Sequence, residues 1–389
     1  MTYNHNFTLP QDLLEQIAEQ GLDYLPELLR IMLNAAMKTE RQQYLGVDPY
    51  ERSPERQGYA NGYKSKTMKT RVGEVTFDVP QVREGNFYPE ALEKGLRSER
   101  ALTLSLAEMY VKGVSTRKVA AIVEKLCGSR VSSSQVSKAA AQMDEKLSAW
   151  RQSQLDEIVY LYLDARYEKV RQDGQVRDAA VLIAVGVGPD GKRKVLGVSV
   201  SLGEQEVHWR AFMESLVKRG LRGVQLIISD DHAGLKAARQ AVFGGLPWQR
   251  CQFHLQQNAQ GYVPREEMKA EVAEDIRTIF NAPNQAMAER YLAETVKKYE
   301  ETASHLANWM EENIPEGLTV FSFPSVHRRR LRTTNNVERL NREIKRRTRV
   351  VGIFTNMASC LRLVSAVLME MSDEWEAADK VYLSPDYFI

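Results

Sequence analysis

The sequence predicts a mixed α/β protein: a five-stranded mixed sheet with helices, interrupted by an all-helical insertion and preceded by helical regions. Two observations carry this prediction. Strand-like apolar runs and helical patterns alternate in the order β-β-β-α-β-α-β through residues 158–253. On both sides of this stretch, apolar residues recur at helical spacing instead. A length of 389 residues is enough for two or three domains.

Residues 1–100 are expected to form a helical region followed by a basic hairpin, with roles in DNA binding and dimerisation. The apolar spacing of residues 13–37 predicts helices. Residues 56–71 hold five basic residues, two tyrosines and no acid, and residues 72–79 alternate like a strand. Such a hairpin favours contact with DNA phosphates, and a solvated surface loop is the equally weighted alternative. Its candidate DNA-binding residues are Arg56, Tyr63, Lys64, Lys66, Lys69 and Arg71.

Residues 101–150 are expected to form a helix-turn-helix-like DNA-binding domain. Breaks at residues 113–116 and 127–129 separate short helical patterns, and the serines after Val131 predict an N-cap followed by a helix. The exposed face of that helix could enter a DNA groove, although short helices joined by tight turns are also common in proteins that never touch DNA. The candidate contacts are Ser133, Gln135 and Lys138.

Residues 155–255 are expected to form the first part of the sheet-containing core. Apolar and β-branched runs predict strands, and amphipathic patterns predict the helices between them. The predicted strands are 158–163, 179–185, 195–200, 224–228 and 248–253, and the predicted helices are 206–218 and 234–242. A Gly-Pro-Asp-Gly turn at residues 188–191 separates the second and third strands, which predicts a meander.

The remaining chain is predicted to be helical. Residues 256–330, rich in Ala, Glu, Lys and Leu, are expected to be an all-helical insertion. Residues 331–372 are expected to complete the core with two helices, the second over residues 357–371, and residues 373–389 to form a C-terminal tail.

Two aspartates follow predicted strands directly. Asp164 follows residues 158–163, and Asp230 follows residues 224–228 with one serine between. Because the ends of neighbouring strands in an α/β sheet form a crevice, two acids at two such ends can share a metal ion. Each aspartate taken alone is more typical of a turn or a helix cap, so the pair in this strand order carries the prediction.

A third acid, Glu338, lies three residues before Asn341 on one face of a predicted helix. Glu343 points about 140° away from it, so the two glutamates cannot serve one site equally. The alternative for Glu338 is a surface ion pair with Arg342, four residues further on. The predicted catalytic and metal-binding residues are therefore Asp164, Asp230 and Glu338.

Three carboxylates without a required cysteine or histidine predict Mg²⁺ or Mn²⁺ rather than zinc. Two such ions per active site, about 4 Å apart, suit phosphodiester chemistry. Residues 328–349 also hold nine arginines and one lysine against two glutamates, which favours polyanion binding over the usual alternative of a solvated basic helix. The candidate DNA contacts here are Arg339, Arg342, Lys345 and Arg346.

Cys251 and His254 have the spacing of half a zinc site. The other cysteines, Cys127 and Cys360, are distant and solitary, so neither a second half-site nor a disulfide framework is indicated. We expect Cys251 and His254 to pack or form hydrogen bonds at the end of the fifth strand, beside the metal site.

Several short motifs occur together in this chain. They are Leu-Asp-Ala-Arg at 163–166, Ser-Asp-Asp-His at 229–232 with Gly-Leu-Lys at 234–236, Cys-x-x-His at 251–254, Thr-Asn-Asn-Val-Glu-Arg-Leu-Asn at 334–341, Gly-Tyr-Ala-Asn-Gly-Tyr at 58–63 and Lys-Thr-Arg-Val-Gly at 69–73. With them the chain resembles the bacterial insertion-sequence transposases of the Mutator type, which carry a DDE triad on a ribonuclease H-like fold. The resemblance makes Asp164, Asp230 and Glu338 the triad, with His232, Cys251, His254 and Asn341 as structural residues nearby.

The resemblance implies binding to terminal inverted repeats, 3′-end cleavage by water, and strand transfer by the freed 3′-hydroxyl. It also implies a homodimer on double-stranded DNA. Asp231 stands where the family often has a small residue, and strand parity leaves open which of the two adjacent acids faces Asp164. The rival functions are a ribonuclease H-like DNA nuclease without strand transfer and a transposase-derived DNA-binding regulator.

The sequence contains no run of about 18 uninterrupted apolar residues and no secretory signal pattern at its start. We therefore expect a cytoplasmic, nucleoid-associated bacterial protein that does not engage a membrane.

Overall fold

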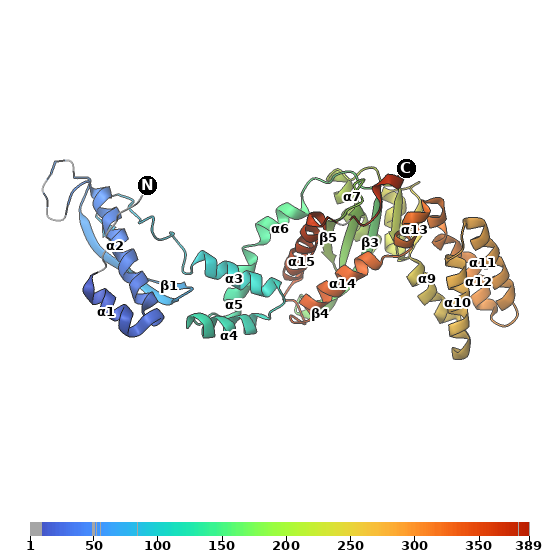
Figure 1. Cartoon of the computed structure of the whole chain (residues 1–389), viewed down its shortest axis with the longest axis horizontal. Coiled ribbons are helices and arrows are strands. Elements are labelled where there is room, and N and C mark those ends of the chain that lie inside the picture. The colour runs from blue at the N-terminus through green and yellow to red at the C-terminus, as the bar shows by residue number, and fades with distance from the viewer. Residues whose placement is uncertain are drawn as a thin grey trace. The chain divides into compact units, whose positions relative to one another are not determined.

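The computed structural model describes residues 10–48, 51, 53–54, 56–83, 85–379 and 381–388. Residues 1–9 of the expected N-terminal region lie outside the described residues, as does the side chain of Asn336. The chain divides into two compact units, Met1–Gln142 and Met143–Ile389, whose elements are labelled in Figure 1.

The first unit begins with two helices and a β-hairpin. Alternate residues of the second hairpin strand, Val75, Phe77 and Val79, are buried, so one face of the hairpin is apolar. Met37, from the second helix, packs in the same cluster. Arg71 stands in the tight turn between the strands. The elements are α1 (Gln11–Gln20), α2 (Leu25–Leu45), β1 (Ala60–Thr70) and β2 (Gly73–Val82), the two strands being antiparallel.

Three short helices complete the first unit. They are α3 (Arg100–Val111), α4 (Thr116–Cys127) and α5 (Ser133–Ala141). Ser115 caps α4 through Lys118 N, and Gly128 ends the helix in the left-handed conformation that favours glycine. Ser132 and Gln135 form a capping box at the start of α5. Helix α5 packs against both α3 and α4.

The second unit contains a five-stranded mixed sheet in the order β5-β4-β3-β6-β7, confirming the predicted mixed sheet. The strands are β3 (Tyr160–Gln172), β4 (Gln175–Val187), β5 (Arg193–Ser201), β6 (Leu226–Ser229) and β7 (Trp248–Arg250). Strand β4 is antiparallel to β3 and β5, whereas β6 is parallel to β3 and β7. Strands β3, β5, β6 and β7 therefore all run in one direction.

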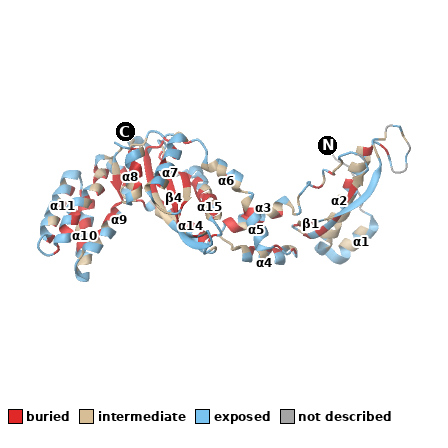
Figure 2. Ribbon diagram, turned by 180° about the vertical axis from the view of Figure 1, so that it is seen from behind, coloured by how far each residue is buried: buried red, intermediate tan, exposed pale blue. Residues whose placement is uncertain are grey.

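Helices cover both faces of this sheet, and Figure 2 shows its strands buried between them. Leu161 and Leu163 belong to the apolar cluster formed with α7 (Glu206–Lys218) and α8 (Ala233–Val242). Tyr162 points to the other face, where its hydroxyl donates to the Arg330 carbonyl oxygen at 3.1 Å. Successive β3 side chains thus alternate between two different helical layers.

Strand β3 is longer than the sequence analysis predicted, so Asp164 does not stand at its end. It lies inside the strand and pairs with Ile183 of β4. Residues 165–172 continue the strand, but four of these eight residues are charged, so no apolar run marks this part of the strand. The strand that does end at this level is β6, whose last residue, Ser229, directly precedes Asp230.

The fifth strand is shorter than predicted. Strand β7 stops at Arg250, and α9 (Gln252–Ala259) begins where residues 251–253 were expected to continue the strand. His254 consequently projects from a helix. The chain between β7 and the last two long helices is helical, as expected, and contains α10 (Lys269–Phe280), α11 (Gln285–Tyr299), α12 (Ser304–Asn313) and α13 (Ser325–Leu331).

Helices α14 (Asn335–Thr348) and α15 (Met357–Ala377) pack against each other and against β3. Helix α6 (Asp144–Arg151) lies almost entirely within residues 101–150, which were predicted to form the helix-turn-helix-like domain, but it belongs to the second unit. There, the Arg362 side chain of α15 donates two 2.7 Å hydrogen bonds to the Asp144 carboxylate. The C-terminal tail lies against the same unit, where Tyr382 N donates to Gly191 O at 2.9 Å.

Candidate functional site

Asp164 and Asp230 lie at matching levels of neighbouring parallel strands. Strands β3 and β6 pair Tyr160 with Leu226 and Tyr162 with Ile228, and two further residues along each strand lead to the two aspartates. Because side chains alternate along a strand, Asp164 shares the sheet face of Tyr162, which is covered by α13 and α14. The fold therefore brings the first two predicted acids to one place.

Asp164 is held by hydrogen bonds on both carboxylate oxygens. Asn341 Nδ2 donates to Oδ2 at 2.8 Å, and Ala165 N donates to Oδ1 at 2.9 Å. Burial raises the pKa of Asp164 to about 7, and the negative charges of Asp230 and Glu204 act in the same direction. The Ala165 N–H and His254 oppose this rise in pKa. A bound cation at this point would offset the cost of burying the carboxylate charge.

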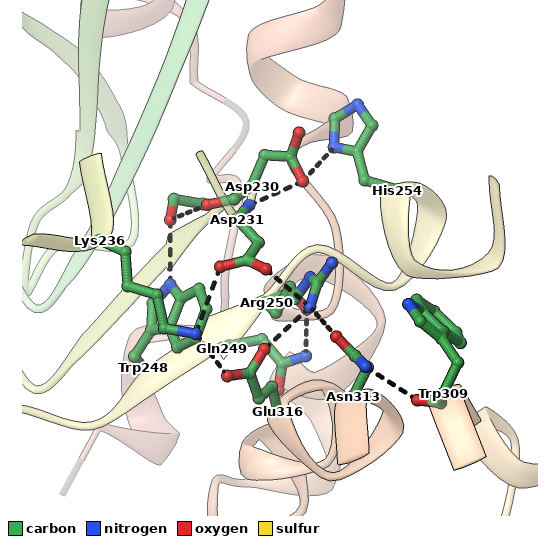
Figure 3. A network of polar contacts seen from close by, with 11 residues as sticks. Asp230, Asp231, Lys236, Trp248, Gln249, Arg250, His254, Trp309, Asn313 and Glu316 are labelled. Atoms are coloured by element: carbon green, nitrogen blue, oxygen red, sulfur yellow. Dashed lines mark hydrogen bonds and ion pairs between the residues drawn. The ribbon is translucent and has the colours of Figure 1, made fainter. Parts of the chain in front are cut away.

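Asp230 and Asp231 point to different surroundings, as Figure 3 shows. Asp230 Oδ1 lies 3.8 Å from His254 Nδ1, and its side chain is 41% exposed. Asp231 instead forms ion pairs with Arg250 at 2.9 Å and with Lys236 at 3.3 Å. Strand parity and side-chain contacts agree that Asp230 is the acid on the Asp164 side.

Arg250 connects the end of the sheet to the helical insertion. It is 3% exposed, and its Nη1 lies 2.9 Å from Asp231, from Glu316 and from the Asn313 side-chain oxygen. Lys236 adds a 2.7 Å bond to Glu316 (Figure 3). These contacts tie β7 and α8 to the end of α12, so Asp231 has a structural role in the network.

Cys251 links the β7–α9 junction to the start of α14. Its sulfur accepts hydrogen bonds from Thr334 N at 3.4 Å and Thr334 Oγ1 at 3.5 Å. Burial is the largest influence on the thiol and raises its pKa, but the hydrogen bond and charge of His254, together with the Thr334 hydrogen bond, leave the pKa of Cys251 below its usual value. The hydrogen bond between Cys251 and His254 raises the pKa of His254 to about 9. His254 thus lies 3.8 Å from Asp230, and Cys251 contacts His254 and Thr334.

Helix α14 presents Glu338 one turn before Asn341, the residue that contacts Asp164. Within the described chain Glu338 forms no ion pair, so the alternative pairing with Arg342 is not seen. Glu343 lies on another face and pairs with Arg346 at 2.6 Å and Arg347 at 2.7 Å. The Arg346 and Arg347 guanidiniums lower the pKa of Glu343 to about 2.

Asp164, Asp230 and Glu338 do not lie close enough to one another to coordinate a single metal ion. Among the described residues, no three histidine, cysteine, aspartate or glutamate side chains are close enough to hold a metal ion. Two buried polar atoms nearby, Asn341 Oδ1 and His254 Nδ1, have no hydrogen-bond partner in the described chain. The donor set is carboxylate and amide oxygen, which fits a hard divalent cation.

Glu204 is an acid near the site that the sequence analysis missed. It follows β5, which runs parallel to β3 and β6, so it emerges at the same end of the sheet as Asp230. His232 Nδ1 lies 3.8 Å from the Glu204 carboxylate. The negative charge of Glu204 raises the pKa of Asp164. The sequence signal that could have identified Glu204 is its position three residues after the end of β5.

Several candidate DNA-binding residues of the hairpin are engaged within the first unit. Arg71 forms an ion pair with Glu99. Lys66 donates to Tyr88 at 2.7 Å, and the Lys69 ammonium donates to the Arg130 carbonyl. The remaining candidates are Arg56, which lies over the Tyr59 ring, Tyr63, which accepts from Arg41, and Lys64, which is exposed.

Helix α5 exposes all three of its candidate residues, Ser133, Gln135 and Lys138. The Gln135 side chain is used in the capping box, where its oxygen accepts from Ser132 N at 2.9 Å. On α14, Arg339, Arg342 and Lys345 are exposed, and Arg346 is paired with Glu343.

No helix in the described part of the chain is both long enough and apolar enough to cross a membrane.

Comparison with known proteins identifies the family. A family model described as transposase, Mutator family, matches residues 1–378. The chain is 57% identical over 370 residues to the transposase for insertion sequence element IS406 of Burkholderia multivorans, covering 95% of each chain. It is 44% identical to the transposase for ISRM5 of Rhizobium meliloti (94% and 91% covered) and 36% identical to that for IS256 in transposon Tn4001 of Staphylococcus aureus (99% and 100% covered). The chain therefore belongs to the Mutator family of transposases.

Proposed function

We propose that this protein is the DNA transposase of an insertion sequence, with Asp164, Asp230 and Glu338 as its catalytic acids. It binds the terminal inverted repeats of its element, cleaves the 3′ ends by hydrolysis, and joins the freed 3′-hydroxyls to target DNA. The observation that carries this proposal is the placement of Asp164 and Asp230 at one level and on one face, with Asn341 of α14 bonded to Asp164.

The core is proposed to be ribonuclease H-like. Its support is the sheet of three antiparallel strands extended by two parallel ones, with Asp164 on β3 and Asp230 directly after the neighbouring parallel strand β6. Helix α14 crosses the aspartate face, and Glu338 lies one helical turn from Asn341. Closure of Glu338 onto the aspartates would complete a three-carboxylate site.

Asp164, Asp230 and Glu338 are proposed to hold Mg²⁺ or Mn²⁺, two ions per active site. When bound, such ions activate the attacking water or 3′-hydroxyl and stabilise the leaving oxygen. Within this chain, Asn341 fixes one Asp164 oxygen and leaves its own buried amide oxygen facing no partner among the described residues. The pKa of His254 is raised to about 9, and its ring lies 3.8 Å from the Asp230 carboxylate, so it places a positive charge beside this acid.

DNA binding is proposed for the exposed basic residues of the hairpin, of α5 and of α14. The exposed side chains of Lys64, Lys138, Arg339, Arg342 and Lys345 support this assignment best. A homodimer is proposed because two ends of one element must be paired, and the setting is proposed to be the bacterial cytoplasm, where the nucleoid lies.

The test is incubation of the purified full-length protein with a labelled duplex carrying the terminal repeat of the flanking element, unlabelled target DNA and Mn²⁺. The proposal expects a cleaved 3′ end and a larger joined product. Cleavage without joining would identify a nuclease, and specific binding without either product would identify a regulator. Either result would overturn the proposal.

A further inference from the structure

A pocket of about 400 Å³ in the second unit is lined by four arginine side chains, together with aromatic, apolar and amide residues. It lies among β5, α13, α14, the end of α15 and the C-terminal tail. The residues that define it are Arg193, Arg330, Arg339, Arg342, Trp375 and Tyr382. It is separate from the acid site, which involves Glu338 and Asn341 on the same helix.

The Arg193 guanidinium is fixed in the wall of this pocket by two aromatic rings. It lies 4.1 Å from the centre of the Trp375 ring and 4.3 Å from the centre of the Tyr382 ring. The Arg330 guanidinium lies 4.9 Å from the Tyr382 ring centre. Stacking of this kind holds the Arg193 guanidinium without neutralising it and leaves its N–H groups available, whereas Arg330 also forms a hydrogen bond with Tyr382. The pocket is therefore preorganised for an acceptor.

The positive charge of the pocket is not matched by an acid among its described lining residues. Burial lowers the pKa of Arg193, and the neighbouring charges of Arg339 and Arg330 lower it further. Glu376, near the end of α15, is engaged outside the pocket by Lys194 at 3.3 Å. An anion entering the pocket would relieve the mutual repulsion of these arginines.

Helix α14 connects this pocket to the acid site. Arg339 and Arg342 lie three residues apart on one face of the helix, and Glu338 and Asn341 lie three apart on a face turned by about 100°. A phosphodiester chain crossing α14 would thus meet the acids on one side and the arginines on the next. Bidentate guanidinium groups are suited to phosphate oxygens.

We propose that the arginine pocket binds a backbone phosphate of the DNA strand whose neighbouring phosphodiester lies in the acid site. This inference rests on the proposed transposase function and adds to it a second phosphate site within the catalytic unit. The pocket positions the strand and takes no part in the bond-breaking step. Arg193 and Arg330 are the residues that sequence reasoning did not assign.

The test uses full-length Arg193→Gln and Arg330→Gln proteins, with Arg329→Gln as the matched control. Arg329 and Arg330 are adjacent on α13 and both exposed, but only Arg330 lines the pocket. Circular dichroism would reveal whether loss of the half-buried Arg193 impairs folding. In that case Arg330→Gln still tests the pocket, because Arg330 is exposed. Binding to a terminal-repeat duplex is measured over a range of salt concentrations in Ca²⁺ or chelator.

The decisive probe is a set of duplexes, each with one phosphate near the cleavage position replaced by an uncharged methylphosphonate. With the unchanged protein, one replacement should weaken binding about tenfold. With Arg330→Gln or Arg193→Gln, this one phosphate replacement should no longer weaken DNA binding, whereas replacements at other positions should weaken it as before. The slope of log affinity against log salt concentration should fall in magnitude by about one. Arg329→Gln should retain the whole profile.

The inference would be overturned if Arg193→Gln and Arg330→Gln lost affinity at the same substituted phosphates as Arg329→Gln. It would also be overturned if the pocket bound a free anion but no DNA phosphate. In the latter case inorganic phosphate would raise the melting temperature of the unchanged protein more than that of Arg330→Gln, while the DNA profiles stayed identical. Failure of the unchanged protein to cleave the unmodified duplex would instead contradict the proposed function itself, so the two failures are distinguishable.

Discussion

Asp230 and Asp231 are adjacent in the chain and have opposite surroundings. Strand parity alone could not decide between them, because the phase of the alternation depends on the pairing register. The register of β6 with β3 and the contacts of Arg250 supply that information, placing Asp231 in an ion-pair network and Asp230 beside His254.

Substitution of each acid by asparagine should therefore have different effects. Asp230→Asn should reduce Mn²⁺-dependent cleavage to background with little change in stability, since its carboxylate has no ion pair with a lysine or arginine among the described residues. Asp231→Asn should retain cleavage but lower the free energy of unfolding by about 1–3 kcal/mol, because Arg250 loses one of two acidic partners. Gel assays of cleavage and urea denaturation would measure both. The reverse pattern would move the metal ligand to Asp231.

Asp164 should make the metal-free protein less stable as pH rises. Its pKa is about 7 in the folded protein, against 3.8 for a free side chain, so the folded state binds the extra proton between these values. The stability contributed by this proton is full below about pH 4 and is lost as pH rises through 7. In a chelating buffer at pH 8, Asp164→Asn should therefore be more stable than the unchanged protein, by on the order of 1 kcal/mol. Thermal melts at pH 5 and pH 8 would test this, and a constant difference between the two proteins would contradict it.

At the level of elements, apolar periodicity located most of the core. The predicted helix at 206–218 coincides with α7, because its buried residues recur at helical spacing. The second half of β3 was missed because half of its residues are charged and form no apolar run, and β7 was predicted too long because Cys251 and Phe253 are apolar. The tie between Cys251 and Thr334 joins residues far apart in sequence, so no local pattern could reveal it.

Cys251 should affect catalysis through the placement of α14. Cys251→Ala removes the acceptor of the Thr334 N–H and hydroxyl, which loosens the start of the helix that carries Glu338. We expect cleavage to fall about 10- to 100-fold while affinity for the terminal-repeat duplex is unchanged. Cys360→Ala is the matched control, because Cys360 is equally buried but lies in α15. Equal losses of cleavage in the two variants would show that the effect is general destabilisation.

At the scale of the whole molecule, the acid site lies entirely in the second unit, whereas the basic hairpin and α5 lie in the first. The apolar face of the hairpin has its own cluster with α2, and α5 packs on α3 and α4, so the first unit contains local cores. We therefore propose that the first unit recognises the terminal repeat and that the second unit carries out the chemistry.

A fragment covering residues 1–142 should consequently bind the terminal-repeat duplex in preference to unrelated DNA at fixed salt. Lys138→Gln should reduce that preference, because Lys138 is exposed on α5. Lys125→Gln, which makes the same charge change on α4, should leave the preference intact. Fluorescence anisotropy with both duplexes would measure the ratio of affinities, and a folded fragment with no preference would refute this division of roles.

Asp164, Asp230 and Glu338 are proposed to act together on DNA. A comparison of Asp164→Asn, Asp230→Asn and Glu338→Gln with Glu343→Gln measures this directly. Glu343 shares α14 with Glu338 but pairs with Arg346 and Arg347 on another face, so it controls for loss of a charge on the same helix. With Mn²⁺ and the labelled terminal repeat, the three variants should yield neither cleaved nor joined product while still binding the duplex, and Glu343→Gln should yield both. Substantial cleavage by any of the three would remove that residue from the site and contradict a catalytic centre built from these three carboxylates.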